Sequence, residues 1–201
     1  HFTTRFRLKL GAEYFITDFN ESYSPLLANS FHYGFDNNLF ASFAESDIFF
    51  SKNLALQIGL RAEHSELLHQ FTLAPRTSLS YKTGTNSQFS FAYGQFYQNP
   101  KNDYLKFHQE FEAENTSHFI ANYQFSKKDQ IFRVEAYYKD YKDLVKFDTN
   151  MPSFASNFSN LGSGYARGVD IFWRQNQKIK NTDYWISYSY FGYGYYEYSP
   201  C

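Results

Sequence analysis

The stretch RFRLKLGAEYFI, residues 5–16, gives the clearest fold signal, because its side chains alternate between two kinds. The odd positions from 5 to 13 hold charged residues or glycine, namely Arg5, Arg7, Lys9, Gly11 and Glu13. The even positions are apolar, namely Phe6, Leu8, Leu10, Ala12, Tyr14 and Ile16. Successive side chains of a strand point to opposite faces, so the stretch predicts a β-strand with one apolar and one charged face.

The same period of two returns along the rest of the chain. It is clear in residues 54–64, 88–94, 132–139, 168–174 and 184–190, and less regular in 38–50, 73–82 and 116–126. With residues 5–16, these spans mark about nine to ten antiparallel, meandering strands. We expect strands of about nine to thirteen residues, which matches the roughly 9 to 11 residues that a tilted strand needs to cross a bilayer. Soluble sheets usually have shorter strands, so an all-β transmembrane barrel segment, an incomplete barrel, is expected.

Connections of two kinds are predicted to alternate between these strands. Short turns are expected at 51–53, 83–86, 127–129 and 175–182, and long connections at 18–36, 66–72, 97–115 and 143–163. Outer-membrane barrels have short periplasmic turns and longer extracellular loops. A soluble β-sandwich also has alternating strands and is the main alternative fold, but it has no reason to sort its connections by length.

The composition fits the same fold. The 201 residues are 22% aromatic but only 43% hydrophobic, as expected when lipid-facing and lumen-facing residues alternate. No run of roughly 18 apolar residues predicts a membrane helix. The net charge of -1, without a clustered basic run, gives no electrostatic footprint for nucleic acid. The single Cys201 excludes an intrachain disulfide framework.

Several segments, in this order, resemble the barrels of TonB-dependent outer-membrane receptors, in the style of Bacteroidetes-type bacteria. They are 59–63 (GLRAE), 74–81 (APRTSLSY), 90–100 (SFAYGQFYQNP), 137–144 (YYKDYKDL) and 160–170 (NLGSGYARGVD). The resemblance implies a barrel of about 22 strands with an N-terminal plug. It places the protein in the bacterial outer membrane, where a TonB complex drives transport through an N-terminal region. Residues 1–201 are then a partial barrel domain, without the plug domain and the closing strands.

Partners and site residues follow from strand parity and from this resemblance. The expected partners are outer-membrane lipid, the plug domain of the same full-length chain, the TonB complex and a small nutrient ligand. Residues predicted to face the lumen or plug are Arg61, Glu63, Arg76, Arg133, Glu135 and Asp170. Loop residues predicted to contact ligand, because aromatic rings and amides suit sugar-like or siderophore-like molecules, are Tyr97, Asn99, Tyr104, Asn157 and Asn160.

Three details of the pattern carry further expectations. Arg167 shares the lipid-facing parity of Val169 and Trp173, so either it lies near the outer interface and snorkels to head groups or a bulge resets the register. Gly11, Gly59 and Gly94 share the lumen parity, where small residues make room for a plug or ease curvature. His64 and Ser65 are adjacent and therefore point to opposite faces, which makes them unusable as a catalytic dyad.

The resemblance therefore implies part of an energy-coupled receptor for a siderophore, haem, an oligosaccharide or a peptide. No enzyme activity, catalytic residue, cofactor or metal site is expected, since the histidines are scattered and no cysteine pair is present. The alternatives are a passive porin or another outer-membrane barrel, and a soluble β-sandwich binding module.

Overall fold

The computed structural model describes residues 5–24, 30–179 and 182–196. Cys201 and part of the predicted turn at 175–182 lie outside these ranges. The described residues form nine strands and one short helix. The strands are β1 (Phe6–Tyr23), β2 (Phe31–Phe49), β3 (Leu54–Ser65), β4 (Gln70–Lys82), β5 (Ser87–Gln98), β6 (Glu114–Lys127), β7 (Gln130–Phe147), β8 (Phe158–Ile179) and β9 (Thr182–Tyr195), and the helix is α1 (Asn102–Leu105).

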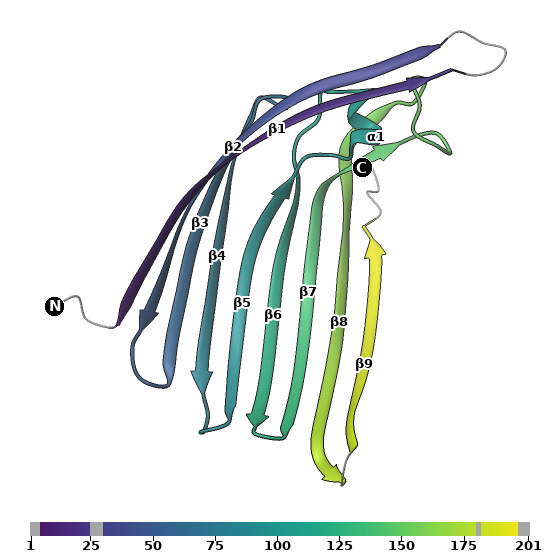
Figure 1. Ribbon diagram of the computed structural model, residues 1–201. Helices are drawn as coiled ribbons and strands as arrows, with labels where there is room; N and C mark the ends of the chain where they lie inside the picture. Colours follow the sequence, from purple (N-terminus) through teal and green to yellow (C-terminus); the bar gives the residue numbers. More distant parts are fainter. Residues whose placement is uncertain (1–4, 25–29, 180–181, 197–201) are drawn as a thin grey trace.

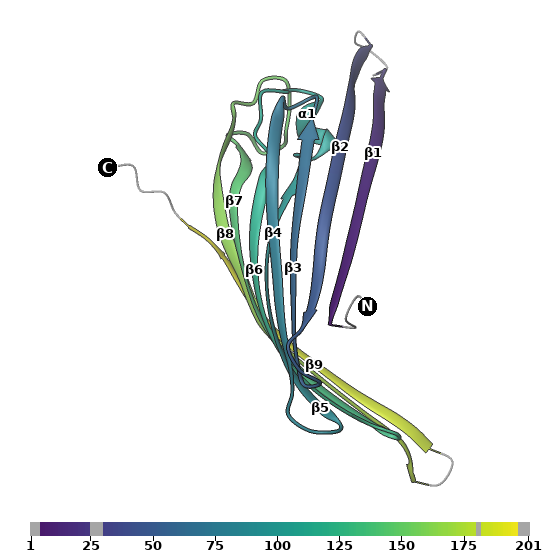
Figure 2. The same cartoon turned by 90° about the vertical axis from the view of Figure 1, so that its left-hand side faces the viewer.

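The strands lie side by side in chain order, β1 to β9, and every neighbouring pair is antiparallel (Figure 1). The predicted meander is therefore confirmed. All nine described strands belong to one sheet, so the two packed sheets of a β-sandwich are not formed. The sheet is curved and twisted (Figure 2) and not closed, because β1 and β9 are its two edges.

The register places the two kinds of side chain on two faces. Leu10 pairs with Ala44, which pairs with Leu60, so these three residues share a face. We call it the apolar face; it carries exposed side chains such as Leu8, Leu10, Ile58, Leu60, Leu79, Phe91, Phe119, Val169 and Ile186. The opposite face, here called the polar face, carries charged residues such as Arg61, Glu63, Arg76, Glu135 and Asp170.

Most strands are longer than the sequence pattern predicts, and the predicted long connections are correspondingly shorter. The connections at one end of the sheet are 24–30, 66–69, 99–113 and 148–157. The predicted loop at 18–36 is mostly paired strand, from Asp18 opposite Asp36 to Tyr23 opposite Phe31. Backbone pairing continues past the point where side chains stop alternating, because ladder hydrogen bonds do not depend on side-chain polarity. Residues 175–179 likewise continue β8.

The expected alternation of connection length fails at one place. The β3–β4 connection, 66–69, is as short as the turn at 50–53. It is a tight turn in which the His69 amide donates to the Glu66 carbonyl at 3.2 Å, with His69 in the left-handed region at φ 48°. The clearly long connections are 99–113, which contains α1, and 148–157, and both lie at the same end of the sheet (Figure 1).

Candidate functional site at the loop end of the sheet

The β5–β6 connection is built around a small hydrophobic core at the end of the sheet. Leu105 at the end of α1 is 2% exposed and packs with Phe111 and with Phe35 of β2. Phe35 stacks on Phe19 of β1 with ring centroids 5.1 Å apart. Both phenylalanines have the parity of the polar face, so this core holds the connection on that side of the β1–β2 hairpin.

An ion pair joins the same connection to the tip of β1. The Lys106 ammonium donates to Glu21 at 2.8 Å and lies 3.3 Å from the Asp103 carboxylate. The hydrogen bond to Glu21 is the main cause that raises the pKa of Lys106. The two residues are far apart in sequence, so this contact fixes where α1 sits relative to the β1–β2 hairpin.

Asn160 ties the connection to β7 and β8. Its side chain accepts a hydrogen bond from the Glu112 amide at 3.0 Å and donates to the Glu112 carbonyl at 3.1 Å and to the Asp143 carbonyl at 2.8 Å. Glu114, which is buried, accepts hydrogen bonds from Gln98 and from the Val145 amide. The loop end is therefore held by amide and carboxylate groups from five different strands and connections.

A cavity of about 200 Å³ lies beside this connection on the polar face. Its lining includes Arg61 and Glu63 of β3, Thr72 of β4, Gln98 of β5 and Asn99 of the connection. One guanidinium, one carboxylate, a hydroxyl and two amides give it both donors and acceptors. This composition suits a polar ligand with several hydrogen-bonding groups.

Arg61 is held by two carboxylates at the wall of this cavity. Its Nη1 lies 2.7 Å from Glu13 of β1, its Nε bonds Glu63, and its side chain is 20% exposed. Ala41 stands between Glu13 and Glu63 in the register and is fully buried. Two carboxylates supply the partners that a mostly buried cation needs, so the group is a fixed part of the cavity wall.

The other predicted lumen residues lie on the same polar face. Arg76 is opposite Gly59 and Gly94, and its guanidinium lies 4.6 Å from the Phe96 ring centroid. The remaining three, Arg133, Glu135 and Asp170, are in β7 and β8, with Glu135 paired to Asp170. All six therefore share one face; whether that face meets a plug stays a prediction.

The five residues predicted to contact ligand are not brought together. Asn99 lines the cavity and donates to Ser65 at 3.3 Å. Tyr104 packs into the loop core, 5.7 Å from the Phe147 ring, and Asn160 holds the backbone as described above. Asn157 donates twice to Asp148, which lowers the pKa of that carboxyl, and thereby closes the β7–β8 connection.

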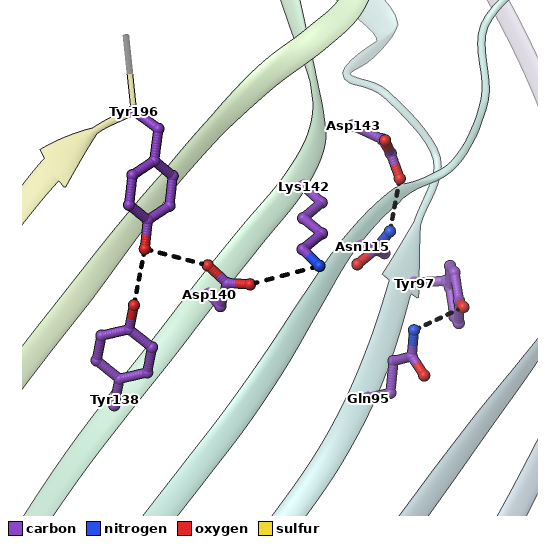
Figure 3. A network of polar contacts seen from close by, with 8 residues as sticks. All are labelled: Gln95, Tyr97, Asn115, Tyr138, Asp140, Lys142, Asp143 and Tyr196. Carbon is purple, nitrogen blue, oxygen red and sulfur yellow. Dashed lines mark hydrogen bonds and ion pairs between the residues drawn. The ribbon is translucent and has the colours of Figure 1, made fainter. Parts of the chain in front are cut away.

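Tyr97 also borders the cavity, but its side chain belongs to the apolar face. Its hydroxyl accepts a hydrogen bond from Gln95 at 2.8 Å (Figure 3). Both side chains have the parity of Tyr93 and Phe91, which belong to the apolar face. The Tyr97 side chain therefore points to the other face from Arg61 and Glu63, and its contact with a ligand stays a prediction.

Tyr97 belongs to a polar belt across the apolar face that the sequence did not reveal (Figure 3). Asn115 donates to Asp143 at 2.6 Å, and Lys142 lies 3.8 Å from Asp140. The Tyr138 and Tyr196 hydroxyls are 2.7 Å apart, and that of Tyr196 also donates to Asp140 at 3.4 Å. We call Gln95, Tyr97, Asn115, Asp140, Lys142, Asp143 and Tyr196 the polar belt. Only strand pairing brings these residues to one level.

The described residues hold neither a metal-binding cluster nor a paired Ser65 and His64. There, no group of three or more histidine, cysteine, aspartate or glutamate residues is placed to hold a metal ion. Ser65 is buried and bonds to Asn37, whereas the neighbouring His64 is exposed on the other face. Within the described ranges, no helix has the length and apolarity needed to cross a membrane.

Solved structures share this fold at low sequence identity. A variant of the ferric enterobactin receptor PfeA of Pseudomonas aeruginosa is 14% identical, with a TM-score of 0.77 over 94% of this chain and 33% of that chain. The FrpB iron transporter of Neisseria meningitidis is 13% identical, with a TM-score of 0.76 over 97% and 34%. The outer-membrane transporter YddB of Escherichia coli is 14% identical, with a TM-score of 0.72 over 94% and 31%.

This chain thus spans about a third of the length of these structures. No curated protein matches it. The family model described as TonB dependent receptor-like, beta-barrel, matches residues 1–200, almost the whole chain. That family consists of outer-membrane transport receptors and not of enzymes. The chain belongs to the TonB-dependent receptor β-barrel family.

Proposed function

We propose that this chain forms part of the barrel wall of an energy-coupled outer-membrane receptor that takes up a scarce nutrient. The family match over residues 1–200 carries the proposal. The full-length chain then contributes a plug domain against the polar face and further strands beyond the two sheet edges, β1 and β9. This chain covers only about a third of the length of each related structure, which supports the presence of a plug and further strands in the full-length chain.

A ferric siderophore is the substrate class that we favour. Two related structures are named as a ferric enterobactin receptor and an iron transporter. The cavity beside Arg61, with its mixed donors and acceptors, supports a polar ligand of this kind. Haem, an oligosaccharide or a peptide are the other substrates to test. The motif style of segments 74–81 and 160–170 supports a Bacteroidetes-type source, which the organism of the gene tests.

The test is uptake by cells that carry or lack the complete gene. We expect deletion to abolish uptake of a radiolabelled ferric siderophore under iron limitation, and loss of the TonB complex to abolish it equally. Uptake that depends on the gene but not on the TonB complex would establish a passive porin instead. Coupled uptake of haem, an oligosaccharide or a peptide, with siderophore uptake unchanged, would replace the substrate class and keep the receptor.

A further inference from the structure

Arg167 is an exposed cation on the apolar face. It pairs with Tyr138 of β7 and shares a face with Val169 and Trp173, with continuous register from Tyr165 through Trp173. The irregularities of the β7–β8 pair lie beyond this stretch, between Tyr141 and Lys146. No bulge therefore turns Arg167 to the polar face, and of the two explanations for its parity only the interfacial one remains.

Arg167 has no carboxylate partner among residues 5–24, 30–179 and 182–196. Its guanidinium lies 5.6 Å from the Tyr165 ring centroid. On its other side, Gly192 leaves open space, with no atom within 4 Å of a Cβ built there. An arginine on a lipid-facing surface is costly unless an anion meets it, and guanidinium groups bind phosphate through two parallel hydrogen bonds.

The polar belt shows at which depth this cation lies. Asp140, which belongs to the belt, pairs with Tyr165, and Tyr138 pairs with Arg167. Arg167 is therefore one row of the apolar face below the belt, about 7 Å along the strand. Below Arg167 the apolar face continues with Val169 and Ile171. The guanidinium thus sits where the hydrocarbon ends and head groups begin.

An apolar groove of about 540 Å³ opens next to this position. Its floor is formed by Ala121 and Ala136, which pair directly across β6 and β7. Its walls include Phe91, Phe119 and Tyr138, and the last of these is the strand neighbour of Arg167. This groove, lined by small and aromatic apolar side chains, matches a hydrocarbon chain.

We propose that the apolar face carries a binding site for an anionic membrane lipid, with one acyl chain in the Ala121–Ala136 groove and the lipid phosphate at Arg167. The occupant is a lipid because the site joins a hydrocarbon groove to a cation at head-group depth that has no carboxylate partner among the described residues. Lys142 and the Tyr196 hydroxyl lie in the belt above, where both contact the Asp140 carboxylate. The proposal does not depend on which nutrient the receptor transports.

Native mass spectrometry of the complete protein, titrated with phosphatidylglycerol or phosphatidylcholine, tests the site. We expect the native protein to bind phosphatidylglycerol more tightly. Arg167→Gln is expected to weaken phosphatidylglycerol binding about fivefold or more, the value of one basic residue at an anionic surface. Arg133→Gln is the matched control, since Arg133 is also exposed beside an aromatic ring, at 5.9 Å from Phe172, but on the polar face.

The groove is tested separately with Ala136→Phe, which fills its floor, against Ala62→Phe, an equal change on the same face outside the groove. Ala136→Phe is expected to weaken binding of both lipids, and Ala62→Phe of neither. Heat-modifiable migration on gels confirms that each variant is folded. Equal phosphatidylglycerol affinity in the native protein and Arg167→Gln would overturn the phosphate contact. Unchanged binding in a folded Ala136→Phe variant would overturn the groove.

Discussion

Arg61 on β3 reaches across β2 to Glu13 on β1, with 2.7 Å between Nη1 and Oε2. The register places Ala41 of β2 between Glu13 and Glu63, and Ala41 is fully buried. The small alanine side chain leaves room for the Arg61 guanidinium to reach from β3 over β2 to β1. Three strands are thereby joined by side chains as well as by their backbone ladders.

Arg61→Gln is expected to lower the free energy of unfolding by about 1.5 to 3 kcal/mol, the usual range for hydrogen bonds to charged groups. The matched change Arg7→Gln should cost less than about 1 kcal/mol, because Arg7 is 66% exposed and its pair with Asp47 is 3.8 Å long. Urea unfolding of the complete protein in lipid vesicles measures both. An equal loss in the two variants would show that the three-strand contact adds nothing.

Ile58→Arg tests the membrane side of the sheet. Ile58 is 48% exposed on the apolar face near the middle of β3, so an arginine there should cost roughly 2 to 4 kcal/mol in a bilayer. Gln57→Arg, one residue earlier on the polar face, should be mild. The same vesicle assay compares them, and equal costs would contradict the assignment of the two faces.

Gly94→Ala tests how the glycines of the polar face are used. A Cβ at Gly94 would lie 2.8 Å from the Phe96 ring, which also contacts the Arg76 guanidinium. The ring must move, at a cost of about 1 to 3 kcal/mol. Gly192→Ala is the control, since open space surrounds that position and the change should be neutral or slightly stabilising. A stable Gly94→Ala variant would refute the ring contact.

Asn160→Ala should loosen the β5–β6 connection, because it removes three hydrogen bonds to the backbone of Glu112 and Asp143. Hydrogen exchange followed by mass spectrometry should show faster exchange in residues 99–113. Asn157→Ala should leave that segment unchanged, since the Asn157 side chain bonds to Asp148 of its own connection. Similar exchange in both variants would argue against Asn160 as the anchor.

Alternation of side chains predicts the central part of most strands and the face on which each side chain lies. Leu54 to Glu63 reads as a strand whatever surrounds it, because the period of two is a property of extended backbone. The face of Arg61, Arg76 and Asp170 follows from the same local parity. Strand ends were less predictable, since residues such as Asp18 to Tyr23 lie beyond the region where one face must be apolar, yet remain paired in the β1–β2 hairpin.

The contacts between strands could not be predicted from the sequence. Sequence parity placed Gly94 on the polar face but did not show that Phe96 covers it. The sequence predicted Tyr97 and Asn160 as loop residues. The register instead brings Tyr97 into the polar belt, and the Asn160 side chain bonds to the backbone of Glu112 in the β5–β6 connection. The physical reason is that alternation fixes the direction of a side chain within its own strand, while its neighbours depend on inter-strand register and on how the connections fold back.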